Sequence, residues 1–516
     1  MNNNRREFLK FLGVTSYSLA GISVLESLVS CQSISPNTFP SLEDDLILAD
    51  GFNYYPLISW GDQINKYDVF GFNNDYITYK PLSSSELIMW VNHEYTHPLF
   101  VSGLERTKEN VDKERRLVGG SIIKVKKIDR KWKFQKDDPV NRGVRGDTPM
   151  TFANGVKVKG LNTVEGTCSN CAGGFTPWNT FLTCEENTHK NYGEHNRKTG
   201  KFKKTRVEWE KFYPHPVEHY GWVVEVDPDT GKAQKHTNLG RFGHESATCI
   251  TSKSGHVVVY SGDDKENEHL YKFVSKNNSD FNQGILYVAN TEQGKWLPLD
   301  LELSPILKKH FKTQLEVLTY AREASKVLGA TELNRPEDIE VHPHTGDVYI
   351  ALTKSASKDD PFGSILKVSE SANDHSATSF KAETFLFGGE LSKFSCPDNL
   401  AFDQNGNLWM SSDISGGAIG KGKYKSFGNN GLFVIPTSGK NAGNVIQVAS
   451  APVDAELTGL SFSPDQKTLF LSVQHPGERT KDLSNPTSNW PTGNMPKPTV
   501  VAIEGAELEK ITQRTK

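Results

Sequence analysis

The chain has 516 residues, a length that exceeds most single domains and indicates either several domains or one closed architecture of repeated units. Its 43 glycines, 25 prolines and 10% aromatic content favour many short strands joined by turns, so we expect an all-β fold. The formal charge of -3 at pH 7, without a basic face-forming run, excludes the electrostatic footprint of a DNA-binding or RNA-binding protein.

The first residues have the features of an export signal. A twin-arginine pair, Arg5 and Arg6, precedes a mildly apolar stretch over residues 11–29, and residues 28–31 resemble a lipobox ending in Cys31. We predict a signal over residues 1–31, passage through the twin-arginine export machinery, and a periplasmic or cell-surface location. No other apolar run approaches the roughly 20 residues of a membrane span. A lipid on Cys31 would thus be the sole membrane attachment; the alternative is a soluble secreted protein cut nearby.

Six later segments share one pattern of strand, polar turn and strand. Alternating apolar positions mark half-buried strands, and turn residues such as Asp-Gln-Asn-Gly at 403–406 separate them. The last three segments start about 60 residues apart, a period typical of propeller blades. In chain order the predicted hairpins are Tyr76–Glu94, Cys171–Glu186, Ala247–Asp264, Ile339–Thr353, Leu400–Asp413 and Leu460–Gln474.

Closure of a ring removes the exposed edges that six separate hairpins would present. The sequence therefore predicts a single domain over residues 32–516, a six-bladed β-propeller with insertions near 100–160 and 280–335.

Acidic residues flank these hairpins. The start of the first strand and the end of the second are neighbours in a hairpin, so residues at both places lie at one end of each blade. We expect them to face the mouth of a central channel. Before the first strands stand Asp75, Glu165, Glu245, Glu337, Asp398 and Glu456. At the ends of the second strands stand Glu94, Cys184, Glu185, Glu186, Asp263, Asp264, Asp413 and His475.

So many carboxylates in one funnel would repel one another by several kcal/mol per close pair at an effective dielectric of about 20. Arg335, Lys272 and Lys354 are too few to balance them, so bound cations are expected. A ring of oxygen ligands suits calcium, whereas the thiolate of Cys184 favours a softer metal such as iron or zinc. The alternative is that the acids cap turns and that Cys184 is a small buried hydrophobe. Recurrence at six equivalent positions favours metal ligands.

The other cysteines beyond the signal are Cys168, Cys171, Cys249 and Cys396. Cys168 and Cys171 form a lone C-x-x-C, without a second pair or a thioredoxin-like βαβ pattern. We expect core packing or a local disulfide for this pair.

Several motifs resemble those of the PhoX-type alkaline phosphatases, over nearly all of the mature chain. The most specific is TPWNTFLTCEEN at 176–187, within NCAGGFTPWNTFLTCEEN at 170–187. The others are WGD at 60–62, FGFNNDY at 70–76, VNHEYT at 91–96, GRFGHE at 240–245, RPEDIEVHP at 335–343, GLSFSPD at 459–465 and QHPGE at 474–478.

The resemblance implies a six-bladed propeller that holds a pair of ferric ions bridged by oxygen, with several calcium ions beside them. By motif position, Cys184 would ligate iron and Arg335 would lie near the substrate phosphate. The resemblance and the hairpin positions together predict Arg335 and Glu337 as catalytic residues. The predicted metal ligands are Cys184, Glu185, Glu186, Glu245, Asp263, Asp264, Glu337, Asp398 and Glu456.

The function predicted on this basis is hydrolysis of small phosphate monoesters at neutral to alkaline pH. Metal ions would polarise the phosphoryl oxygens and supply the nucleophile, and Arg335 would contact the phosphate as a forked donor. Two alternatives remain from the residues. One is a calcium-dependent lactonase or esterase on a propeller, which has no use for a thiolate. The other is a non-catalytic calcium-binding surface lipoprotein.

Overall fold

A computed structural model describes residues 39–513 of the chain. The predicted signal at 1–31 lies outside these residues, so export and lipidation stay predictions. Within the described part, no helix has the length and apolar character needed to cross a membrane.

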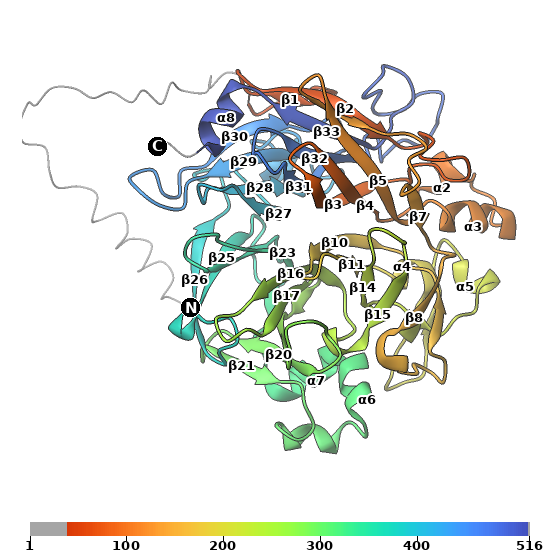
Figure 1. Cartoon of the computed structure of the whole chain (residues 1–516), viewed down its shortest axis with the longest axis vertical. Helices are drawn as coiled ribbons and strands as arrows, with labels where there is room; N and C mark the ends of the chain where they lie inside the picture. Colours follow the sequence, from red (N-terminus) through yellow and green to blue (C-terminus); the bar gives the residue numbers. More distant parts are fainter. Residues whose placement is uncertain (1–38, 514–516) are drawn as a thin grey trace, which may run out of the picture. The chain divides into compact units, whose positions relative to one another are not determined.

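Six antiparallel hairpins form the inner part of six blades, as predicted (Figure 1). The innermost strands are β3 (Asn74–Ser83), β10 (Asn170–Phe175), β16 (His244–Thr251), β23 (Pro336–Val341), β27 (Pro397–Phe402) and β31 (Glu456–Phe462). Their partners are β4 (Glu86–His93), β11 (Phe181–Glu185), β17 (Val257–Asp263), β24 (Val348–Leu352), β28 (Leu408–Ser412) and β32 (Leu469–Gln474). Each innermost strand lies beside those of the two adjacent blades, and β31 lies beside β3, so the ring is closed. The predicted six-bladed β-propeller is confirmed.

Further strands extend each blade outward. They are β5 (Gly119–Ile128), β6 (Lys131–Phe134) and β7 (Arg142–Val144) in the first blade, and β14 (Val223–Val226), β15 (Ala233–His236), β8 (Pro149–Phe152) and β9 (Thr163–Glu165) in the second. The third to sixth blades add β19 (Leu270–Ser275), β20 (Gly284–Asn290), β21 (Lys295–Pro298), β25 (Ser364–Glu370), β26 (Phe380–Phe387), β29 (Gly431–Ile435), β30 (Ile446–Ser450) and β33 (Thr499–Glu504).

The beginning of the described chain completes the last two blades. Strand β1 (Ile47–Leu48) pairs with β30, and β2 (Asn53–Ser59) pairs with β33. Strands from opposite ends of the sequence thus share a sheet, which links the first and last parts of the ring by backbone hydrogen bonds.

Apolar side chains fill the space between neighbouring blades. The second strands of the inner hairpins are buried on both faces, and they accordingly contain apolar runs such as VYIAL in β24 and VVVY in β17. The centre of the ring is tight. A Cβ on Gly174 would lie 2.0 Å from the Ala247 carbonyl oxygen of the next blade, and one on Gly459 would lie 2.3 Å from that of Asp75. Only glycine permits these close approaches between inner strands.

Helices and short strands occupy the insertions. They are α2 (Pro98–Val101), α3 (Lys108–Arg115), α4 (His189–Tyr192), α5 (Trp209–Phe212), α6 (Gln314–Thr319), α7 (Ala321–Leu328), β12 (Glu194–His195), β13 (Phe202–Lys203), β18 (Glu266–Glu268) and β22 (Leu333–Asn334). Helix α8 (Ala506–Thr512) follows the last strand, β33. Short 3₁₀ turns lie at Ala153–Gly155, Val217–His219, Thr237–Leu239, Pro305–Lys309, Ser371–Asn373 and Gly422–Tyr424. The predicted insertions near 100–160 and 280–335 contain α2, α3, α6 and α7. The sequence analysis did not anticipate the insertion with α4 and α5.

Each inner hairpin has a β-bulge near its open end. The register shifts, for example, between Asn74 and Ile77 and between Pro336 and Ile339. In four blades the residue before the first strand has a left-handed backbone, with φ of 48° at Asn73, 55° at Ser169, 52° at Arg335 and 52° at Cys396. Bulges of this kind re-aim side chains at the rim of a sheet. Here the second residue of the strand reaches the channel in five blades, and the first residue, Glu456, does so in the sixth.

Candidate metal centre

A cavity of about 390 Å³ lies at the end of the channel where the inner hairpins open. Residues from all six blades line it, which confirms that the hairpin ends converge. The lining includes Asp75, Glu94, Tyr95, Ser169, Cys171, Glu186, Asn187, Lys190, Asn191, Glu245, Asp264, Arg335, Glu337, Asp398, Asp413, Glu456, Thr458, His475 and Glu478.

One residue near the start of each innermost strand reaches this cavity, and the six positions are equivalent. Five of the side chains are carboxylates and one is a thiol. They are Asp75, Cys171, Glu245, Glu337, Asp398 and Glu456. The six blades therefore supply one potential metal ligand each from their innermost strands.

A second set comes from the residue directly after the partner strand. Glu94 follows β4, Glu186 follows β11, Asp264 follows β17 and Asp413 follows β28. The sixth blade places His475 there, after β32. In the fourth blade the residue is Thr353, whose hydroxyl donates to Glu337 Oε1 at 2.7 Å.

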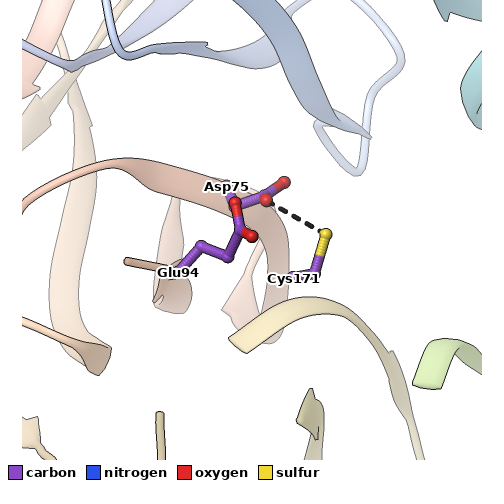
Figure 2. A group of neighbouring side chains, drawn as sticks. All are labelled: Asp75, Glu94 and Cys171. Carbon is purple, nitrogen blue, oxygen red and sulfur yellow. Dashed lines mark hydrogen bonds between the residues drawn. The ribbon is translucent and has the colours of Figure 1, made fainter. Parts of the chain in front are cut away.

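Three groups of these side chains bring their ligand atoms within 4.8 Å of one another. Figure 2 shows the first, in which Cys171 Sγ donates to Asp75 Oδ2 at 3.4 Å beside Glu94. The second group is Cys171, Glu186 and Glu245, and the third is Glu245, Asp264 and Glu337. Cys171 and Glu245 each belong to two groups, so neighbouring ions could share them as ligands.

The chemistry of the donor set fits bound cations. Burial raises the pKa of the Glu245 carboxyl well above its usual range, and the nearby Glu186 and Glu337 raise it further. Its Oε2 atom is buried without a hydrogen-bond partner, as is Oδ1 of Asp413. A buried carboxylate oxygen without a partner is costly, and a cation would satisfy it.

The structure corrects the assignment of the cysteines. Cys184 is fully buried in the apolar cluster between the second and third blades, where it packs with Leu182, Val223 and Ala247. It does not line the channel cavity, whereas Cys171 does. All five cysteines of residues 39–513 are free thiols, so the disulfide considered for Cys168 and Cys171 is wrong.

Two predicted carboxylate ligands also lie elsewhere. Glu185 accepts hydrogen bonds from Lys235 Nζ at 2.6 Å and from the backbone amides of Gly221 and Trp222 at 2.9 and 3.1 Å. Asp263 forms a bidentate ion pair with Arg322. Successive side chains of a strand point to opposite faces, so Glu186 and Asp264 reach the channel and their predecessors do not.

Other residues expected near the funnel form ion pairs or hydrogen bonds outside the cavity instead. Glu165 lies on β9 and pairs with Arg115 at 2.6 Å, and Lys272 pairs with Glu370 at 2.9 Å, fully buried. Lys354 Nζ donates to Ser415 Oγ at 3.0 Å at the rim. Of the three expected cations, only Arg335 lines the cavity itself.

Arg335 is fixed by the acids around it. Nε and Nη2 donate to the two oxygens of Asp264 at 2.6 and 2.8 Å, and Nη2 lies 2.9 Å from Glu337 Oε1. Burial alone would raise the pKa of Asp264, but the guanidinium outweighs it and holds that pKa below its ordinary value.

His475 is likewise held by neighbouring groups, here those of the sixth blade. Its Nε2 lies 3.3 Å from Glu456 Oε1, and its Nδ1 lies 2.9 Å from the Asp454 carbonyl oxygen. Burial and the neighbouring Asp413 raise the pKa of Glu456 to about 8. The site therefore contains both a guanidinium and an imidazole among its acids.

The cavity residues that sequence reasoning missed include Cys171, Lys190 and Tyr95. A signal for Cys171 was present, because Ser169-Asn170-Cys171 occupies the place of Asn73-Asn74-Asp75 in the first blade. Lys190 and Tyr95 lie outside the repeated hairpins, so the repeat carried no information about them.

Comparison with known proteins identifies the family. The sequence model of the alkaline phosphatase PhoX family matches residues 35–477, most of the chain. The chain belongs to the PhoX alkaline phosphatase family. A structure of Pseudomonas fluorescens PhoX in complex with vanadate, a transition state analogue, is 29% identical, with a TM-score of 0.79 over 91% of this chain and 97% of that one.

More distant structures share less with this PhoX chain. A Dyadobacter fermentans protein of unknown function is 8% identical (TM-score 0.41, covering 89% of this chain and 100% of that one). A Xanthomonas campestris gluconolactonase is 11% identical (TM-score 0.34, covering 88% and 97%). No curated protein sequence matched the chain. Family membership makes the protein a metal-dependent phosphatase that hydrolyses phosphomonoesters, and it removes the lactonase and the non-catalytic lipoprotein as alternatives.

Proposed function

We propose that this PhoX protein releases phosphate from small monoesters at neutral to alkaline pH, with an iron and calcium cluster in the channel. The observation that carries the choice of metals is Cys171, whose sulfur lies within 4.8 Å of carboxylate oxygens in two groups of side chains. A thiolate favours a transition metal such as iron, whereas the surrounding carboxylate oxygens suit calcium.

The residues divide naturally between the two kinds of ion. Iron would be held through Cys171, with carboxylates from the first three blades around it. Calcium would be held by the carboxylates on the other side of the channel. The proposed iron ligands are Cys171, Asp75, Glu94, Glu186 and Glu245, and the proposed calcium ligands are Glu245, Asp264, Glu337, Asp398, Asp413 and Glu456. When bound, these ions supply Lewis acidity toward the phosphoryl oxygens and activate the attacking water.

Arg335 binds the substrate phosphate in this proposal. Asp264 and Glu337 orient its guanidinium, and its remaining nitrogen, Nη1, has no acceptor among residues 39–513. That nitrogen can donate to a phosphoryl oxygen as a charge-assisted hydrogen bond. Glu337, which also accepts from Thr353, then has two roles, as a metal ligand and as the group that positions Arg335.

A pair of cysteine variants tests the metal assignment. We expect Cys171→Ser to lose iron, thiolate-to-iron colour and phosphatase activity together, because a hydroxyl is a poor substitute for the thiolate. Cys184→Ala is the matched control, since its thiol packs in the apolar core. It should keep iron and turnover and lose only stability. Metal analysis and hydrolysis of p-nitrophenyl phosphate measure both. Normal iron in the Cys171→Ser protein, or iron loss only in Cys184→Ala, would overturn the assignment.

We also propose export through the twin-arginine machinery and a lipid on Cys31. The supporting features are the Arg5-Arg6 pair and the lipobox-like residues 28–31. Mass spectrometry of the mature N-terminus tests both, and an unlipidated N-terminus at another residue would leave a soluble secreted protein.

A further inference from the structure

Two long cationic side chains line the cavity, Arg335 and Lys190. Arg335 is engaged by Asp264 and Glu337 through hydrogen bonds and an ion pair. The ammonium of Lys190, by contrast, forms no ion pair or hydrogen bond with any other residue in the range 39–513. The mouth of the cavity therefore contains a positive charge that no described group neutralises by direct contact.

The backbone below Lys190 is firmly held. On one side of it in α4, the Asn191 amide oxygen accepts from Ser169 Oγ at 2.9 Å. Beyond that, Tyr192 is buried and stacks on Tyr220 with ring centroids 4.0 Å apart, and Trp209 packs against its ring. The Lys190 side chain is exposed, whereas Asn191 and Tyr192, which follow it, are buried. An anchored backbone and a side chain without a protein partner are what we expect of a residue that binds a ligand.

The carboxylates that influence Lys190 belong to three different blades. They are Glu186, Glu94 and Asp264, which line the same cavity as Lys190. A protonated lysine has three donors and no lone pair with which to ligate a metal. Once cations neutralise these acids, its charge is available to an anion at the same place.

From this arrangement we propose that Lys190 is a substrate-positioning residue that donates to a non-bridging oxygen of the phosphoryl group, on the solvent side of the cluster. This inference rests on the proposed phosphatase site. The ligand class is a tetrahedral phosphate dianion, as free phosphate or as an ester. Arg335 and Lys190 would then hold the phosphoryl group from two sides, one cation fixed by acids and the other free to follow the substrate.

Binding of inorganic phosphate to the metal-loaded enzyme tests this role without relying on turnover. A charged hydrogen bond of this kind corresponds to about a 10- to 100-fold change in affinity. We expect Lys190→Met to weaken phosphate binding by that factor in calorimetry and to raise the inhibition constant of phosphate equally. The Michaelis constants of p-nitrophenyl phosphate and of esters with uncharged leaving groups should rise together. Lys190→Arg should recover most of the affinity, with metal content and melting temperature unchanged throughout.

Lys211→Met is the matched control. Lys211 is exposed on α5, where its Nζ lies 3.1 Å from Glu208, and it does not line the cavity. It should behave as the unmodified enzyme. Unchanged phosphate affinity in Lys190→Met would overturn the inference, as would loss of metal or a defect confined to esters with anionic leaving groups. An inactive but fully metallated unmodified enzyme would instead refute the proposed function itself.

Discussion

Lys235 provides a quantitative test of whether Glu185 is a structural ion-pair partner or a metal ligand. Its ammonium is fully buried on β15, donates to Glu185 at 2.6 Å and to the His219 carbonyl oxygen at 3.0 Å, and lies 4.4 Å from the centroid of the Tyr220 ring. Lys235→Met removes the cation and leaves the Glu185 carboxylate buried beside two backbone amides. Breaking one partner of a buried ion pair costs about 3–5 kcal/mol.

The expected change in melting temperature follows from the size of the domain. With an unfolding entropy of about 2.1 cal/mol/K per residue, roughly 475 residues give about 1 kcal/mol/K, so the loss corresponds to about 3–5 °C. We expect this shift in calorimetry at saturating calcium, with iron and calcium content unchanged, because the pair lies between strands and not in the channel.

A matched variant distinguishes a structural pair from a metal site. Glu185→Gln in the Lys235→Met background should recover part of the lost stability, since the uncompensated charge is then removed. The reasoning is refuted if either variant loses metal in proportion to its stability, or if Lys235→Met melts at the original temperature.

Two further outcomes follow from the same structure. Burial alone would raise the pKa of Glu225, but hydrogen bonds from His236, Thr180 and Trp178 lower it to about 2. The lowered pKa corresponds to about 3 kcal/mol of folding stability. This stability is fully present above the unfolded pKa of about 4.5 and is lost as the pH falls toward 2. Glu225→Gln should therefore flatten the acid limb of a stability profile measured by denaturant unfolding, and an unchanged limb would contradict this. Removal of calcium by a mild chelator should abolish phosphate release, and added calcium without iron should restore much of it, because oxygen-ligand sites exchange more readily than a thiolate-held iron. Activity that survives chelation, or fails to return with calcium, would count against the mixed cluster.

The amino-acid sequence by itself determined the repeated hairpins and the end of the blades at which acids gather. Both depend on local chemistry, namely alternating apolar residues and turn-forming runs such as DQNG at 403–406. Six copies of this local pattern were enough to predict the ring, because only closure satisfies all their edges. Glu245, Glu337, Asp398 and Glu456 were therefore found without tertiary information.

Only the tertiary structure decided which of several consecutive polar residues enters the channel. In the run Cys184-Glu185-Glu186, Glu185 points away from the channel, Cys184 lies within β11 and packs against the adjacent blade, and only Glu186, just beyond the strand end, lines the cavity. Cys171 reaches the cavity because a bulge and a left-handed residue re-aim the start of β10. The pairing of β1 and β2 with the last two blades is equally long-range, since it joins segments more than 400 residues apart. Local patterns specify strands and turns, whereas the direction of a side chain at a strand end depends on contacts between blades.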